Sequence, residues 1–253
     1  MVNVIMHGCN GRMGQTITRL IEEDEHIKIV AGIDQFAKEV NDYPVFEHIG
    51  KCNVKADVVI DFSNAAAADD LLDVCVEKQI PVILCTTGLS KSQLQKVEEA
   101  SHKVAVLKSA NMSLGINMLL KLLQDATKIL APAGFDIEIV EKHHNQKVDA
   151  PSGTALALAD SVNEVLNHEY AYKFDRSQER KKREKKEIGV VAVRGGSIVG
   201  EHEVIYAGAD EVIEFKHTAY SKAVFGKGAI EAAKFLAGKA PGLYDMSHVI
   251  AAS

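Results

Sequence analysis

A pair of histidines followed by a lysine lies in the middle of the chain. His143 and His144 are adjacent, and Lys147 follows in the stretch EKHHNQKVDAPSGTA. Imidazole and ammonium groups carry and deliver protons near neutral pH, so this cluster suits acid–base catalysis. A zinc site is disfavoured, because adjacent residues of an extended chain point to opposite sides and no thiol or acid pattern completes a ligand set. A solvated basic loop is the structural alternative.

The same stretch runs into an expected helix start. Pro151 and Ser152 are typical of a helix N-terminus, and Gly153 and Thr154 would follow as its first residues, with their N–H groups at the helix start. Such a terminus binds anions, because its N–H groups and the helix dipole favour negative charge. We expect a substrate carboxylate there, with phosphate as the competing ligand.

A second motif, GCNGRMG, follows the first expected strand. Gly8 permits a tight turn, Gly11 lets the backbone approach a pyrophosphate, and Gly14 allows helix and strand to pack closely. The spacing is GxxGxxG rather than GxGxxG, and an ordinary turn is the alternative interpretation. Asp34 ends the second expected strand, twenty residues beyond Gly14, where an acid would bind the ribose hydroxyls of a dinucleotide. Taken alone, Asp34 is equally explained as a turn-forming residue.

The residues around Asp34 bear on the choice of cofactor. The carboxylate would repel a 2′-phosphate, and Gln35 offers no charge to attract one, although Lys38 is near enough in sequence to soften the repulsion. The order strand, glycine loop, helix, strand and acid predicts a nicotinamide dinucleotide site. We expect NADH or NADPH as cofactor, with a preference for NADH or use of both.

Apolar strands and amphipathic helices alternate over the first 110 residues. Strands are expected at 2–6, 27–33, 58–62, 82–84 and 104–107, and helices at 12–23, 65–78 and 91–101. This pattern predicts an α/β fold in which a doubly wound parallel sheet forms a dinucleotide-binding domain, with ligands at the carboxyl ends of the strands.

The pattern changes after Ser109. Helices are expected at 114–129, 154–166 and 227–238, and strands at 136–141, 188–194, 197–207 and 212–219. The later strands alternate apolar with polar residues, which predicts an α+β domain with a mixed, open sheet. We expect a dinucleotide-binding domain of residues 1–112 and 223–253, and a substrate-binding and oligomerisation domain of residues 113–222.

Composition excludes several classes of protein. Lys and Arg number 29 against 35 Asp and Glu, a net charge of −6, which disfavours a nucleic-acid-binding protein. The tract 176–187 holds seven basic and three acidic residues, and a solvated helix or mobile loop is expected there rather than a nucleic-acid patch. No stretch has the length of a membrane span or the form of a signal peptide. Four cysteines without a CxxC motif indicate reduced thiols and a cytoplasmic protein.

These motifs together resemble the 4-hydroxy-tetrahydrodipicolinate reductase (dihydrodipicolinate reductase) family. The string E-x-H-H-x-x-K-x-D-A-P-S-G-T-A is similar to the family signature, and GxxGRMG, VVIDFS, TTG, SANMSLGIN, RGGSIVGEH and GLYDM extend the resemblance over the whole chain. The resemblance implies hydride transfer from NADH or NADPH to a small cyclic dicarboxylate, with loss of water, in lysine and diaminopimelate synthesis. It also implies a two-domain subunit and a homotetramer assembled through the second sheet.

The resemblance further implies roles for individual residues. His143 is the expected acid/base residue and Lys147 the expected proton donor. The residues expected to bind substrate are His144, Gly153 and Thr154. The residues expected to bind the cofactor are Gly8, Cys9, Asn10, Gly11, Arg12, Met13, Asp34, Cys85, Thr86, Thr87, Ser109, Ala110, Asn111 and Met112.

Two other functions remain as alternatives. A semialdehyde dehydrogenase needs a thiol nucleophile in its catalytic domain, but the last cysteine is Cys85, within the first domain. A non-catalytic NAD-binding sensor module would use the first domain alone, and it would have no need of His143 or Lys147.

Overall fold

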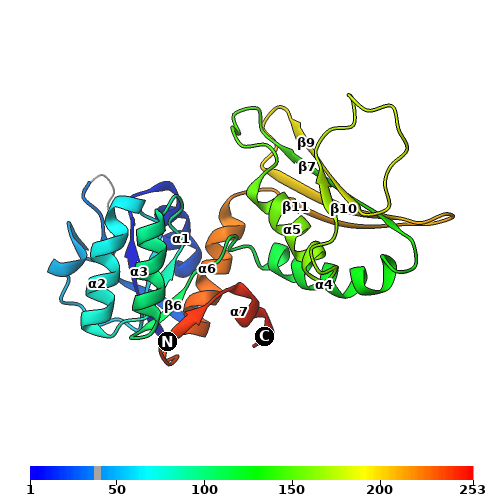
Figure 1. Ribbon diagram of the computed structural model, residues 1–253. Coiled ribbons are helices and arrows are strands. Elements are labelled where there is room, and N and C mark those ends of the chain that lie inside the picture. The colour runs from blue at the N-terminus through cyan, green and yellow to red at the C-terminus, as the bar shows by residue number, and fades with distance from the viewer. Residues whose placement is uncertain (37–40, 253) are drawn as a thin grey trace. The chain divides into compact units, whose positions relative to one another are not determined.

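A computed structural model describes residues 1–36 and 41–252, so Lys38 lies outside the described residues. The chain divides into two compact units (Figure 1). Unit 1 comprises Met1–Leu114 and Ala223–Ser253, and unit 2 comprises Gly115–Lys222. The roles that we assigned to the two domains stay predictions. No helix in the described part of the chain is long and apolar enough to span a membrane.

Unit 1 is built on a parallel sheet of order β12-β6-β5-β4-β1-β2-β3. Its strands are β1 (Val2–His7), β2 (Ile27–Ile33), β3 (Val45–Phe46), β4 (Val58–Asp61), β5 (Val82–Leu84), β6 (Ala105–Leu107) and β12 (Gly242–Tyr244). Its α-helices are α1 (Arg12–Glu22), α2 (Ala68–Lys78), α3 (Lys91–Ser101), α6 (Ala223–Leu236) and α7 (Met246–Ala251). The predicted doubly wound α/β fold is confirmed.

Alternate residues of the central strands feed two separate cores. Val4 and Met6 of β1 pack with apolar residues of α1, α6 and α7 on one face of the sheet. Ile5 packs with residues of α2 and α3 on the other face. Because both faces are covered, each strand is apolar along its length, which is why the strand positions were readable from the sequence.

Unit 2 contains a five-stranded sheet of order β11-β10-β7-β9-β8. Its elements are α4 (Leu114–Leu130), β7 (Asp136–His143), α5 (Gly153–Glu164), β8 (Ala171–Lys173), β9 (Glu187–Arg194), β10 (Gly200–Ala207) and β11 (Val212–Ala219). β7 runs parallel to β9 and antiparallel to β10, so the sheet is mixed, as predicted. Ile137 and Ile139 of β7 pack with residues of α4 and α5, and this covered side is called the inner face below.

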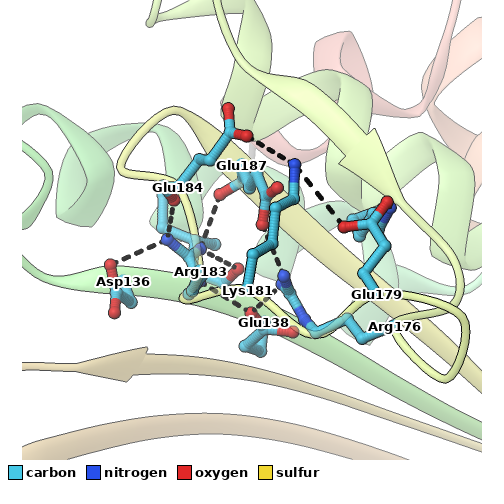
Figure 2. A network of polar contacts seen from close by, with 10 residues as sticks. Asp136, Glu138, Arg176, Glu179, Lys181, Arg183, Glu184 and Glu187 are labelled. Carbon is cyan, nitrogen blue, oxygen red and sulfur yellow. Dashed lines mark hydrogen bonds and ion pairs between the residues drawn. The ribbon is translucent and has the colours of Figure 1, made fainter.

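The opposite, outer face of β7 carries charged residues. The basic tract forms a loop between β8 and β9 and contains no helix, so the loop alternative of our prediction applies. Arg176 and Arg183 of this loop pair with Glu138 of β7, and Arg183 also pairs with Asp136 (Figure 2). Both arginines are therefore held against the sheet by carboxylates rather than being fully solvated.

Several element boundaries differ from the prediction. β7 continues to His143, whereas the expected strand ended at Glu141. β10 begins at Gly200 rather than at residue 197, and α6 begins at Ala223 rather than at 227. The sequence did not reveal the short elements β3, β8, β12 and α7, nor the 3-10 helix η1 (Ile49–Lys51), and the helix expected at 65–78 divides into the 3-10 helix η2 (Ala65–Ala67) and α2.

Candidate cofactor and catalytic sites

The glycine loop of unit 1 has little space for side chains. Gly8 has a φ of +81°, and a Cβ there would lie 2.7 Å from the carbonyl oxygen of Phe62. A Cβ on Gly14 would lie 2.2 Å from the carbonyl oxygen of Gly8. Gly11 is the N-cap of α1, and among the described residues no side-chain hydrogen bond caps this end. The loop therefore directs main-chain N–H groups at the helix start outward, as a pyrophosphate site requires.

Asp34 lies against this loop. Its carboxylate accepts hydrogen bonds from the main-chain N–H groups of Asn10 and Phe36, each at 3.0 Å. A cavity of about 380 Å³ adjoins the loop and is lined by Gly8, Gly11 and Asp34 among others. The spacing of Asp34 from the glycines thus does bring the acid to the loop, at the carboxyl ends of β1 and β2.

Glu47 and Asp70 also line this cavity, so three carboxylates including Asp34 surround it. His48 lies among them: its Nδ1 accepts a hydrogen bond from the N–H of Gly50, and its Nε2 lies 3.3 Å from Asp70. The negative charge of the cavity is greater than Asp34 alone suggested.

A buried carboxylate that our sequence reasoning did not single out ties three strand ends together. Asp61, the last residue of β4, is fully buried. It accepts hydrogen bonds from the Ser63 hydroxyl at 2.6 Å and the Thr86 hydroxyl at 2.6 Å, and it lies 2.8 Å from Nδ1 of His7. The VVIDFS motif was the available signal. Asp61 fixes the loops after β1 and β5 in which expected cofactor residues lie.

The other expected cofactor residues fall into two groups. Some have buried side chains: Cys9 and Met112 belong to the core, and burial, with the nearby Asp34, raises the pKa of the Cys9 thiol to about 11. Burial also raises the pKa of Cys85 well above its ordinary value. These residues offer main-chain groups rather than thiolates. Thr86 is also buried, and the residues that are exposed or half-buried are Asn10, Arg12, Met13, Cys85, Thr87, Ser109, Ala110 and Asn111.

In unit 2, the buried end of β7 brings a carboxylate and an imidazole together. Glu141 and His143 are two residues apart and therefore point to the same, inner face. Nδ1 of His143 lies 2.6 Å from Oε2 of Glu141, whose side chain is 0% exposed. A Cβ on Gly200 would lie 3.1 Å from Nε2 of His143, so the glycine provides room for this ring.

Arg194 and Ser152 complete the hydrogen bonding of Glu141. The guanidinium of Arg194 donates to both carboxylate oxygens, at 2.8 and 2.7 Å, and the main-chain N–H of Ser152 donates at 2.9 Å. Burial raises the pKa of Glu141, but the hydrogen bonds from Arg194, His143 and Ser152 outweigh it, so the pKa lies below its ordinary value. Glu141 is therefore an ionised, fully paired carboxylate in the interior.

His202 of β10 lies edge-on to His143, with ring centroids 5.1 Å apart. Its Nε2 is 3.2 Å from the Ser152 hydroxyl, which accepts a hydrogen bond from the N–H of Ala155 and so has its own hydrogen to donate. Burial, aided by the charge of His143, lowers the pKa of His202 to about 4. His202 is thus a neutral ring that supports His143, and sequence reasoning identified neither it nor Arg194 as part of the site.

The loop after β7 places the remaining expected residues. Lys147 pairs with Asp149 at 2.8 Å. The hydrogen bond from Lys147 lowers the pKa of Asp149, and the N–H of Gly153 contributes to the same effect. His144 is half-buried, and Gly153 and Thr154 form the first turn of α5. The carboxylate of Asp149 therefore pairs with the ammonium group of Lys147 and lies near the N-terminus of α5.

This arrangement in unit 2 combines a proton-carrying ring, an ammonium group and a carboxylate-binding helix start. The loop of unit 1 combines a closely packed glycine turn at a helix N-terminus with a carboxylate, Asp34, held against it. Such a set of groups is typical of a nicotinamide-dependent oxidoreductase acting on an anionic substrate.

Comparison with known proteins identifies the family. The chain matches the family model "Dihydrodipicolinate reductase, N-terminus" over residues 2–112 and "Dihydrodipicolinate reductase, C-terminus" over residues 115–250. It is 52% identical to the 4-hydroxy-tetrahydrodipicolinate reductase of Clostridium novyi, over 99% of this chain and 98% of that protein. It is 50% identical to the enzyme of the same name from Caldanaerobacter subterraneus, with the same coverage. The chain belongs to the dihydrodipicolinate reductase family.

Solved structures support the fold. A dipicolinate-bound dihydrodipicolinate reductase from Paenisporosarcina sp. TG-14 superposes with a TM-score of 0.81 at 22% identity, over 97% of each chain. A probable dehydrogenase from Thermotoga maritima gives a TM-score of 0.62 at 12% identity, over 96% of this chain and 91% of that one. The family is one of NAD(P)H-dependent oxidoreductases, and the resemblance found in the sequence motifs is confirmed.

Proposed function

We propose that the chain reduces 4-hydroxy-tetrahydrodipicolinate to tetrahydrodipicolinate and water, as a step of lysine and diaminopimelate synthesis. The observation that carries the proposal is the position of Asp149. Its carboxylate pairs with Lys147, the expected proton donor, and the N–H of Gly153, at the helix start expected to bind a substrate carboxylate, contributes to its lowered pKa. A dicarboxylate substrate would displace Asp149 from the helix start, and Lys147 would then be released from Asp149 to donate its proton to the substrate. The relatives' names support the same reaction.

Each group of unit 2 has a role in this proposal. Lys147 donates the proton that accompanies reduction, and His143 acts as the acid/base residue. The residues that hold the substrate carboxylates are His144, Gly153 and Thr154, through the imidazole, the main-chain N–H groups of α5 and the threonine hydroxyl.

The glycine loop of unit 1 fits a dinucleotide, because Gly8 and Gly14 allow the turn to pack closely against its own backbone, and the N-cap residue of α1, Gly11, has no side chain to cover the helix start. When bound, the nicotinamide supplies the hydride. The residues proposed to hold the cofactor are Gly8, Cys9, Asn10, Gly11, Arg12, Met13, Asp34, Cys85, Thr86, Thr87, Ser109, Ala110, Asn111 and Met112. Thr86 contributes its main chain, since its hydroxyl is bound to Asp61.

We also propose a preference for NADH or use of both cofactors. Three carboxylates, of Asp34, Glu47 and Asp70, line the cavity beside the glycine loop, and they disfavour a 2′-phosphate. Replacement of Gln35 by Arg supplies a guanidinium next to Asp34. The variant should raise kcat/KM for NADPH by about tenfold, with little change for NADH, and added salt should reduce the gain. A wild type that strongly favours NADPH, with no response to Gln35→Arg, would contradict this preference.

A cytoplasmic homotetramer is the proposed working form. On the outer face of the unit 2 sheet, Val191, Val193 and Val212 are exposed beside the charged residues of β7, and exposed apolar side chains of this kind favour association. The four cysteines are free, which suits a reducing compartment. Sedimentation equilibrium of the purified protein tests the assembly, and a monomer at all concentrations would contradict it.

One assay tests the reaction itself. The purified chain is supplied with the product of the preceding synthase, generated in the same cuvette, and oxidation of NADH and NADPH is followed. We expect substrate-dependent oxidation with at least one cofactor. Cofactor binding without any substrate-dependent oxidation would instead indicate the NAD-binding sensor module, which membership of a reductase family does not favour.

A further inference from the structure

Glu141 and Arg194 form a buried clamp at the centre of the unit 2 site. Both Arg194 N–H groups that face the carboxylate are within 2.8 Å of it, in a two-pronged geometry that fixes the carboxylate plane. Two further groups contact the carboxylate of Glu141: Nδ1 of His143 and the main-chain N–H of Ser152, which is the N-cap residue of α5. Arg194 also donates to the main-chain oxygen of Asp149, in the loop that carries Lys147.

The clamp therefore touches every element of the proposed catalytic machinery. Glu141 binds the His143 ring and the start of the anion-binding helix, while Arg194 binds the loop of Lys147. Burying such an ion pair is costly, and it is compensated only when further hydrogen bonds satisfy the remaining atoms. Each oxygen of Glu141 has two donors, so the condition is met for the carboxylate, while Nε of Arg194 is buried without a hydrogen-bond partner among the described residues.

We propose that Glu141, held by Arg194, is a positioning residue that fixes the tautomer of His143, with Nδ1 protonated and Nε2 left for proton exchange. This inference rests on the proposed function for its catalytic consequence. A carboxylate only accepts hydrogen bonds, so the nitrogen 2.6 Å away must carry the hydrogen. The neighbouring ring of His202 and the α-carbon of Gly200 restrict His143 from its other sides.

The Glu141→Gln variant probes this directly. The amide must place its NH₂ at one of the two oxygen positions. At Oε1 it would face two donors that cannot reverse, Ser152 N–H and Arg194. At Oε2 it would face Arg194 and His143, and His143 is able to reverse by taking the other tautomer. We therefore expect the variant to hold neutral His143 with the hydrogen on Nε2, the wrong nitrogen for the proposed role.

The first measurement is the ¹⁵N NMR spectrum of histidine-labelled protein, with His143 assigned by comparison with His143→Gln. Wild type should show neutral His143 protonated at Nδ1, and Glu141→Gln should show it protonated at Nε2. This spectrum is independent of turnover, so it tests the positioning even if the proposed reaction is wrong. A wild-type ring protonated at Nε2 would overturn the proposal, and this test remains decisive if Glu141→Gln fails to fold.

The second measurement is steady-state kinetics with a matched control. Glu141→Gln should lower kcat by about 10²-fold, the lower end of the range for loss of acid–base assistance, with KM for the cofactor unchanged. The control is Glu138→Gln, on the same strand and also held by arginine, in its case by Arg176 and Arg183, but on the outer face. It should leave kcat and the His143 spectrum unchanged. Equal effects of the two variants, or a wild-type spectrum and rate in Glu141→Gln, would refute the positioning role.

Discussion

Glu138 and Glu141 lie three residues apart on β7, and both are bound by arginine, but their surroundings differ. The Glu138 side chain is 29% exposed on the outer face, and its arginines come from the 174–186 loop, which they fasten to the sheet (Figure 2). The Glu141 side chain is 0% exposed on the inner face, and its arginine comes from the adjacent strand β9.

Glu138 and Glu141 also differ in the groups that surround them in addition to their arginines. Around Glu138 the additional groups are other carboxylates and lysines, such as Glu187 and Lys181, which balance charge within the loop. Around Glu141 they are His143 and the N-cap of a helix. An arginine–carboxylate pair alone thus does not mark a catalytic site. The pair of Glu141 differs because it also binds an imidazole and a helix start, the groups to which we assign the proposed chemistry.

The largest effect is expected at the groups proposed to handle protons. His143→Gln or Lys147→Ala should lower kcat by about 10²–10⁴-fold, the usual range for loss of acid–base assistance. The affinity for NADH should not change, because both residues belong to unit 2. Steady-state kinetics and cofactor titration measure the two quantities. Near-wild-type turnover in both variants would mean that His143 and Lys147 do not handle protons, and the inner face of β7 would then have no catalytic role that the outer face lacks.

The sequence predicts the longer strands of unit 1 but not its shortest ones. The strands β2 and β5 have the predicted bounds, because continuous apolar runs identify strands that are covered on both sides. Strands β3 and β12 have only two or three residues, and their pairing depends on a neighbouring strand rather than on their own pattern.

The residues of the candidate site could likewise be predicted only where they lie close together in the sequence. His143 and Lys147 are recognisable because they lie within one short motif. Arg194 and His202 are fifty or more residues away from it, and only the strand register places them beside Glu141 and His143. Both residues lie at the ends of the motif RGGSIVGEH, which was the available signal, but the motif does not encode the strand register, so their contacts with Glu141 and His143 could not be predicted from it.

The second effect is the contribution of His202, an inner-face residue, to the pH dependence of the free energy of unfolding. The pKa of His202 falls from 6.5 to about 4 because the ring is buried. Between these values the unfolded chain binds a proton that the folded chain does not, so stability decreases as the pH falls from about 6.5 to 4. The loss approaches about 3 kcal/mol. His202→Gln should remove this part of the dependence while keeping a partner for Ser152.

Urea unfolding at several pH values measures this dependence. The exposed His102 provides the control, since His102→Gln should leave it unchanged. Glu141 also contributes to acid sensitivity, but at lower pH: its pKa is lowered from 4.5, so its stabilisation is lost as the pH falls through that lowered value. A dependence between pH 6.5 and 4 that is identical in wild type and His202→Gln would contradict the assignment.

The third effect concerns Arg183, which binds the outer face of β7. Its replacement should lower the free energy of unfolding without changing activity. Arg183 donates to Asp136 and Glu138 and to the main-chain oxygens of Ile137 and Glu187. Arg183→Ala should reduce the free energy of unfolding by about 2 kcal/mol, because it leaves several acceptors unpaired. The kcat/KM should stay within about twofold of wild type. Arg180, an exposed arginine of the same loop, provides a control of equal charge change.

The smallest effect tests binding at the helix start rather than proton transfer. Thr154→Val keeps the shape of the side chain and the main-chain N–H but removes the hydroxyl proposed to bind a substrate carboxylate. A hydrogen bond to a charged group contributes about 1.5 kcal/mol, so KM for the substrate should rise by about tenfold. If the hydroxyl binds the ground state and the transition state equally, kcat should change by less than about twofold. Thr154→Ser restores the hydroxyl and should return KM towards the wild-type value. A normal KM in Thr154→Val would place the carboxylate elsewhere, and a fall in kcat without a change in KM would mean that Thr154 acts through the position of α5, together with Glu141 and Ser152, rather than by binding substrate.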